Sequence, residues 1–161
     1  MLHLKYQSRV DWAKITLVQN EIYVIGGKHQ DMLQASNQCL KVNLKTGVVI
    51  KRRSMDVTRM GHATCLVGHY IYVTGGLKDL SEVDLGQKNP TPIETNARYN
   101  ILKNTWEEIA PLIGGAAKSS STLIAVGKWL YQIAGNFGDS NIWRLNLSKP
   151  FDFDAWEKVD A

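Results

Sequence analysis

Short apolar and aromatic runs alternate with polar turns along this chain, and the same arrangement occurs three times. The runs IYVIGG at 22–27, IYVTGG at 71–76 and LYQIAG at 130–135 each end in glycine. A second apolar run precedes each of them, over 15–18, 65–67 and 123–126. Two turn-forming residues separate the members of each pair, which is the spacing of a β-hairpin. The pattern predicts three hairpins and no convincing helix.

Two more strands are expected after each hairpin. The segments 41–44, 98–101 and 144–147 share one form, in which a basic residue, an apolar residue, asparagine and an apolar residue follow one another. Because asparagine favours turns, it is expected to end a strand. A further apolar residue follows each segment, at Val49, Trp106 and Trp156, and marks a fourth strand. Each unit is therefore predicted to contain four short strands.

The three units repeat with a period that varies at one place. Tyr23 and Tyr72 are 49 residues apart, and Tyr72 and Tyr131 are 59 residues apart. The variation lies between the second and third strands, in the segments 28–38, 77–96 and 136–141. Insertions that recur at one place in a repeat collect on one face, which is often the binding face. Four strands per repeat of this length are typical of a β-propeller.

These features resemble the Kelch repeat family of β-propellers. The resemblance rests on the doublets Gly26-Gly27 and Gly75-Gly76, the spacing from Tyr99-Asn100 to Trp106, and the segment Arg59-Met60-Gly61-His62. It covers nearly the whole chain, but the third unit has Ala134-Gly135 for its doublet and the first has Val49 for its tryptophan. The WD40 alternative is weaker, because Gly61-His62 occurs once and no Trp-Asp pair ends a unit.

The resemblance implies an all-β fold of Kelch-type propeller blades, each a sheet of four antiparallel strands. The three blades are expected at 11–56, 57–112 and 113–161, with 1–10 as the outermost strand of a preceding blade. Large aromatic residues are expected to fill the space between blades: Tyr23, Tyr72, Tyr131, Trp106 and Trp156. Propellers close with roughly 4–8 blades, so three blades leave apolar faces open. The chain is expected to be a partial propeller or half of a six-bladed ring formed by a homodimer.

Composition and charge narrow the class of protein. The chain has 161 residues, of which 44% are hydrophobic, with a net charge of +4 and a pI near 9.1. No apolar run reaches the ~20 residues of a membrane helix, and Cys39 and Cys65 are too few for a disulfide framework. The basic residues are spread out instead of forming a stripe, which argues against nucleic-acid binding. We expect a cytoplasmic protein with free thiols that binds neither membrane nor nucleic acid.

The sequence predicts no metal, no cofactor and no nucleophile. The four histidines are not spaced as ligand pairs with each other or with the cysteines, although His62 is placed where it could face the central channel. The sequence has no nucleophile elbow, phosphate loop or dinucleotide fingerprint. Asp152 and Asp154 are close in sequence but are expected to lie in a turn.

The candidate binding residues lie in two kinds of connection that a Kelch-like blade places on the same face. One kind joins the second and third strands, and the other joins successive blades. The residues are Lys28, His29, Arg52, Arg53, Arg59, Lys118, Asn136 and Asp139. In ligand-binding Kelch propellers an arginine at the entry to the inner strand often lines the central pocket. Carried to Arg59, this implies an acidic peptide ligand, because a guanidinium suits carboxylates. The alternative is an interblade hydrogen bond or salt bridge.

Two classes of function follow from the resemblance. Kelch propellers commonly act as scaffolds or adaptors, so the first is a non-catalytic module that binds another protein or peptide through this face. Nothing resembles the BTB or F-box domain of a ubiquitin-ligase receptor, so that role is not assigned. The second class is a Kelch-like enzyme, such as a sugar epimerase or mutarotase, or a copper oxidase. The first is preferred because no acid–base pair or copper ligand set can be placed.

Overall fold

The computed structural model describes residues 10–30, 32–78, 92–112, 119–133, 135, 140–152 and 155–159. Within these residues there are strands, turns and connections but no helix, so no described helix is long and apolar enough to cross a membrane. Most of the strands belong to three four-stranded antiparallel sheets. The all-β fold of four-stranded blades is confirmed.

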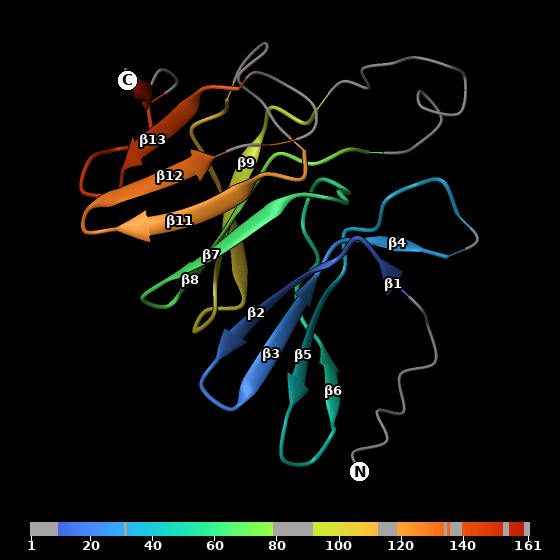
Figure 1. The fold of residues 1–161 in the computed structure, drawn as a ribbon. Helices are drawn as coiled ribbons and strands as arrows, with labels where there is room; N and C mark the ends of the chain where they lie inside the picture. Colours follow the sequence, from blue (N-terminus) through green and yellow to red (C-terminus); the bar gives the residue numbers. More distant parts are fainter. Residues whose placement is uncertain are drawn as a thin grey trace.

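Each sheet is one blade, and its strands pair in chain order (Figure 1). Blade 1 contains β2 (Lys14–Val18), β3 (Glu21–Ile25), β5 (Cys39–Asn43) and β6 (Val49–Lys51). Blade 2 contains β7 (Ala63–Val67), β8 (Tyr70–Thr74), β9 (Asn96–Asn100) and β10 (Thr105–Ile109). Blade 3 contains β11 (Thr122–Val126), β12 (Trp129–Ile133), β13 (Ile142–Asn146) and β14 (Trp156–Val159). The strand expected over 1–10 lies almost wholly outside the described residues, and the limits between blades stay a prediction.

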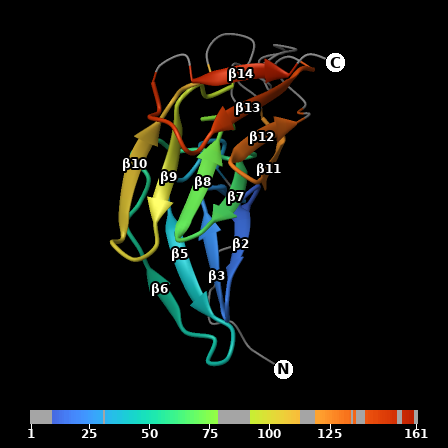
Figure 2. The same cartoon turned by 90° about the vertical axis from the view of Figure 1, so that its left-hand side faces the viewer.

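The blades lie side by side, with their first strands in a row. β7 is in contact with β2 on one side and with β11 on the other, and both ribbon views show this order (Figures 1 and 2). The Thr16 hydroxyl of β2 donates to the Thr64 hydroxyl of β7 at 3.1 Å. The first strands therefore form the inner edge, as in neighbouring blades of a β-propeller.

Turn chemistry sets the ends of the strands. Gly68 and Gly127 have φ values of 59° and 57° in the hairpin turns, a backbone conformation that glycine adopts without steric cost. Asn43, Asn100 and Asn146 end the third strands, and their side-chain oxygens accept N–H groups two or three residues later. This asparagine turn explains why the basic–apolar–Asn–apolar pattern marks the end of a strand.

The hydrophobic core lies between the blades. Between blades 1 and 2 it contains Tyr23, Ile25, Cys39, Met55, Ile71, Val73 and Tyr99. Between blades 2 and 3 it contains Ala63, Tyr72, Ile109, Ala110, Leu112, Leu123, Leu130, Leu145 and Trp156. Burial raises the pKa values of Tyr23 and Cys39 to about 12, so both stay protonated at neutral pH. The expected role between blades is confirmed for Tyr23, Tyr72 and Trp156, and the half-buried Trp106 packs against the core between blades 1 and 2. The expectation is wrong for Tyr131, which is half-buried and belongs to neither core, because it lies in β12 of blade 3.

Tryptophans of the outermost strands link each blade to the preceding one. The Trp106 indole N–H donates to the Arg53 carbonyl at 2.7 Å, and the Trp156 indole N–H donates to the Ala110 carbonyl at 2.9 Å. Both carbonyls belong to the connection that leaves the preceding blade. Blade 1 has Val49 at the equivalent position, and valine cannot donate this hydrogen bond.

Candidate functional site

Lys28 and His29 are held by backbone pairing beside the entry to blade 1. They form β4 (Lys28–His29), which pairs antiparallel with β1 (Val10–Asp11). The Lys28 ammonium donates to the carbonyls of Gln30 and Met32 at 3.4 and 3.2 Å, so it bends back over its own connection. The sequence does not predict this small sheet, because two-residue strands carry no alternating pattern.

The connection after β3 and the connection after β6 are joined by their backbones. The Gly27 N–H donates to the Arg59 carbonyl at 2.9 Å, and the Arg59 N–H donates to the Ser36 carbonyl at 3.0 Å. The Met55 N–H donates to the Asn37 carbonyl, and the Asn37 side-chain amide donates to the Met55 carbonyl, both at 2.9 Å. The two kinds of connection therefore meet on one side of blade 1, as the resemblance to Kelch repeats implies.

Blade 2 has the same kind of junction. The Leu112 N–H donates to the Glu94 carbonyl at 2.9 Å. The buried side chain of Asn96 donates to the Ala110 carbonyl at 2.9 Å and accepts the Gly75 N–H at 3.2 Å. The joined connections are thus a feature of the repeat and belong to more than one blade.

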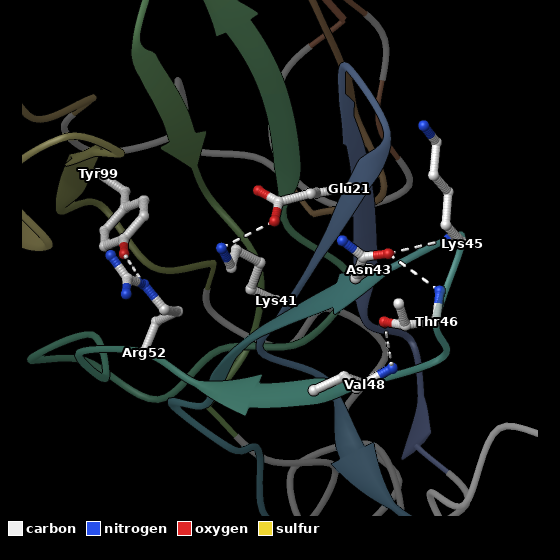
Figure 3. A network of polar contacts seen from close by, with 8 residues as sticks. All are labelled: Glu21, Lys41, Asn43, Lys45, Thr46, Val48, Arg52 and Tyr99. Atoms are coloured by element: carbon white, nitrogen blue, oxygen red, sulfur yellow. Dashed lines mark hydrogen bonds and ion pairs between the residues drawn. The ribbon is translucent and has the colours of Figure 1, made fainter.

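Arg52 and Arg53 attach the end of blade 1 to blade 2. The Arg52 Nε donates to the Tyr99 hydroxyl at 3.1 Å (Figure 3), and this hydroxyl donates to the Asn104 side chain at 2.7 Å. The hydrogen bond to Tyr99 is the main cause of the raised pKa of Arg52. The Arg53 N–H donates to the same Asn104 oxygen at 2.9 Å, and Arg53 is exposed. Arg53 is therefore the better placed of the two for a partner.

Arg59 is a buried link between two blades. It is 1% exposed, and its Nη1 donates to the carbonyls of Gly75 and Thr95 in blade 2 at 2.8 and 3.1 Å, whereas its backbone is paired with blade 1. Burial lowers the pKa of the guanidinium to about 10, so it stays charged at neutral pH. These are the interblade hydrogen bonds that the sequence left as an alternative. A contact between Arg59 and an acidic ligand stays a prediction.

A small cleft of about 70 Å³ lies beside Arg59, where blades 1 and 2 meet. It is lined by Met55, Asp56, Val57, Arg59, Thr95, Asn96, Ala97, Trp106, Glu107 and Glu108. Typical ligand pockets measure roughly 300–1,000 Å³, so this cleft is too small for a sugar. Its three carboxylates also disfavour an acidic ligand. An acidic partner would have to contact the exposed connections outside the cleft.

A larger cleft of about 320 Å³ lies at the connection between β13 and β14. Its lining includes Asp152 and Glu157, and Glu157 is ion-paired with Arg144 at 3.0 Å. Asp154 lies outside the described residues. In the described part of the chain, no three His, Cys, Asp or Glu side chains form a group that could hold a metal ion.

His62 is packed between the glycines of two blades. It is 0% exposed. A Cβ added at Gly26 would lie 2.7 Å from its imidazole Cε1, and one added at Gly76 would lie 3.0 Å from its Cβ. Neither ring nitrogen has a hydrogen-bond partner among the described residues. The sequence shows the glycine doublets but not the imidazole they accommodate, since that contact joins different blades.

The remaining candidate residues lie outside the described part of the chain. They are Lys118, Asn136 and Asp139, together with residues 79–91 of the long connection in blade 2. Their place on the candidate face stays a prediction.

Comparison with known proteins agrees with this architecture. A family model described as the Kelch motif matches residues 58–113, which include all four strands of blade 2. Kelch-like protein 36 of Bos taurus is 26% identical over 126 residues. Kelch-like protein 13 of Mus musculus is 25% identical over 114 residues. Residues 58–113, which include blade 2, match a Kelch motif, and the chain is similar to Kelch-like proteins over most of its length.

The two matches to Kelch-like proteins cover most of this chain but a small part of the relatives. They span 78% and 71% of this chain, and 19% and 16% of the two Kelch-like proteins. The solved structure of YjhT superposes with a TM-score of 0.75 at 15% identity, over 94% of this chain and 52% of that chain. This likeness shows the fold alone.

Proposed function

We propose that this Kelch chain is a non-catalytic interaction module, a scaffold or adaptor that binds another protein through one face. The observation that carries the proposal is the backbone pairing of the two kinds of connection at Gly27, Ser36 and Arg59. This pairing ties the connection whose length varies between blades to the connection that joins successive blades, and variable connections on one face are where repeat scaffolds often bind partners. A cytoplasmic location is part of the same proposal.

The proposed partner is a protein segment or peptide that carries acidic side chains. Lys28, His29, Arg52 and Arg53 supply basic groups on the described connections, and the buried Arg59 adds a positive charge in the connection after β6. Lys118, Asn136 and Asp139, which lie outside the described residues, are included in the face as a prediction from the sequence. A guanidinium binds a carboxylate through two parallel hydrogen bonds, and the net charge of +4 favours the approach of an acidic partner.

Binding to peptides of equal length, rich in glutamate, in lysine or in glycine and serine, tests this proposal. We expect the acidic peptide to bind best by fluorescence polarisation. The double variant Lys28→Glu and Arg53→Glu should weaken its binding by about tenfold or more. The control variant Lys45→Glu and Lys103→Glu reverses the same charges in the exposed turns after β5 and β9. An equal loss in both, or no binding of the acidic peptide, would rule out the face.

A Kelch-like enzyme, such as an epimerase, a mutarotase or an oxidase, is the class that we place second. Catalysis of this kind would need an acid–base pair or a metal set in a pocket. The cleft beside Arg59 measures about 70 Å³, and in the cleft of about 320 Å³ the Glu157 carboxylate is ion-paired with Arg144. A ligand that binds only the folded state raises the unfolding temperature. We expect neither Cu²⁺ nor sialic acid to raise it, and a clear rise with either would contradict the non-catalytic assignment.

A further inference from the structure

Backbone hydrogen bonds run from blade to blade at the inner edge of the molecule. Trp12, Gly61 and Ser120 each lie two residues before the inner strand of a blade, with φ values of 60°, 60° and 54°. The Gly61 N–H donates to the Trp12 carbonyl at 3.0 Å, and the Ser120 N–H donates to the Gly61 carbonyl at 2.6 Å. This backbone conformation is unfavourable for residues other than glycine. Because Trp12 and Ser120 adopt it as well as Gly61, we infer that this backbone hydrogen bond between neighbouring blades is a feature of the repeat.

This series of hydrogen bonds is open at both ends. Within the described residues, the Trp12 N–H has no acceptor and the Ser120 carbonyl has no donor. The Trp12 N–H is a donor and the Ser120 carbonyl is an acceptor, so each could make one more hydrogen bond of the same kind. A blade added at either end would continue the series with the geometry already present.

The inner strands at the two ends also expose apolar side chains. On β2, Ile15 and Leu17 are 64% and 59% exposed, and on β11, Ile124 and Val126 are 45% and 57% exposed. In β7, which has a neighbour on each side, all residues are buried or half-buried. Among the described inner strands, exposed apolar side chains therefore occur on the two that have a neighbouring blade on one side only.

Blade 2 shows how the outward side of a blade is covered, where the outward side means the side that faces the next blade along the chain. Cys65 and Val67 of β7 pack against the core that blade 2 shares with blade 3. The Arg98 guanidinium lies 4.2 Å from the centre of the Tyr70 ring. The same guanidinium lies 5.0 Å from the centre of the Phe151 ring of blade 3. An outward side therefore has an apolar strand and an arginine stacked on an aromatic ring.

Blade 3 has the same outward side at equivalent positions. Ile124 and Val126 of β11 replace the two covered residues of β7. The Arg144 guanidinium lies 4.1 Å from the centre of the Trp129 ring and is ion-paired with Glu157 at 3.0 Å. This side of blade 3 has no blade packed against it within the described residues.

Blade 1 exposes the opposite, inward side, which is the side that faces the preceding blade along the chain. Ile15 and Leu17 occupy in β2 the positions that Leu123 and Ala125 occupy in β11, and there these residues contribute to the core shared with blade 2. The first and third blades thus expose the two complementary halves of an interface that the chain already makes twice.

We propose that a second copy of this chain packs on both open sides, with blade 3 of each copy against blade 1 of the other. The partner's Trp12 N–H then donates to the Ser120 carbonyl, and the inner series of hydrogen bonds closes into a ring. Six blades lie within the roughly 4–8 that close a propeller, and one two-fold axis relates the two contacts. The match to YjhT covers 52% of that chain, which leaves room for about one more copy. This inference does not depend on the proposed binding face.

The closing contacts are weaker than the contacts inside one copy. Val49 of blade 1 replaces the tryptophan that donates an interblade hydrogen bond from Trp106 and Trp156. The pair is therefore expected to separate on dilution.

The solution mass tests the pairing first. Sedimentation equilibrium of residues 1–161 should show a closed species of twice 18.1 kDa, with single copies appearing at low concentration. Single copies at every concentration would overturn the proposal and would indicate that further blades come from a longer polypeptide. A series of ever larger species, or aggregation, would overturn it as well, because it would mean that two copies do not close.

Charged substitutions on the open sides test the head-to-tail arrangement. Leu17→Glu and Val126→Lys should each give single copies, because each places a lone charge in the contact. An equimolar mixture should recover twice the mass, since the new charges meet in one contact and the other contact is unchanged. Leu102→Glu, at a side chain that is 76% exposed in the turn after β9, is the control and should leave the pair intact. A mixture that stays single, or a control that separates equally, would overturn the arrangement. Circular dichroism of each variant confirms that the fold is kept.

Discussion

At the scale of single residues, His62 is a base that the fold holds in its neutral form. Its side chain is 0% exposed, and burial, together with the charges of Arg59 and Lys14, lowers its pKa well below the ordinary value. In the unfolded chain the imidazole titrates near pH 6.5. Below that pH the unfolded state takes up a proton that the folded state does not bind. Stability is therefore lost as the pH falls through this range.

The expected loss from His62 is about 1 kcal/mol of unfolding free energy between roughly pH 7 and pH 5.5. Urea titrations at the two pH values measure it. His62→Gln should remove this part of the pH dependence, because glutamine does not titrate. His69→Gln makes the same change in an exposed hairpin turn and should keep the dependence of the parent chain. An unchanged dependence in His62→Gln would show that other groups cause it.

Asn100 closes the turn after β9 with its side chain. It is 1% exposed, and its Oδ1 accepts the N–H groups of Leu102 and Lys103 at 3.1 and 3.0 Å. Asn100→Ala leaves both donors without this acceptor, so we expect a loss of about 1–2 kcal/mol in urea denaturation. Asn43→Ala removes the same kind of turn where the backbone is exposed to water, and its loss should be smaller. Equal losses would mean that burial does not set the cost.

At the scale of elements, the glycine doublets allow the end of one strand to meet the start of another. Gly76 has φ +94°, and a Cβ there would lie 2.8 Å from the Met60 carbonyl oxygen. Gly76→Ala should therefore cost about 2 kcal/mol or more, from backbone strain and overlap together. Gly127→Ala, at φ +57° with nothing within 4 Å, adds only strain and should cost about 1 kcal/mol. Thermal unfolding of both variants checks the difference, and an equal cost would rule out the overlap.

The blades could be predicted from the sequence because their signals are local. The alternation around Tyr23 and Tyr72 and the turn asparagine at Asn100 each act within a few residues, so they mark strands and strand ends. The small sheet of β1 and β4 was not predictable, because two-residue strands have no pattern of their own. The link through Trp12, Gly61 and Ser120 is also hidden, since it uses backbone atoms and three unlike side chains.

At the scale of the whole molecule, the candidate site was only partly predictable. The resemblance to Kelch repeats implied that the connections after β3 and β6 lie on one face, and the structure joins them at Gly27 and Arg59. The burial of Arg59 did not follow from its position in the repeat. Exposure at a blade edge depends on what the neighbouring blade brings against it, here the carbonyls of Gly75 and Thr95.

This position of Arg59 predicts how the molecule unfolds. Repeat proteins are held together by contacts between neighbours, and the Arg59 side chain binds blade 2 while its backbone binds blade 1. Arg59→Met leaves two carbonyls without a charged donor, so we expect a loss of about 2 kcal/mol or more. Because that contact is weakened, the amides of β3 should lose protection from hydrogen exchange before those of β12. Arg53→Met, in the same connection but exposed, should change neither stability nor the order of exchange. If β3 and β12 still exchange together in Arg59→Met, the guanidinium does not couple the two blades.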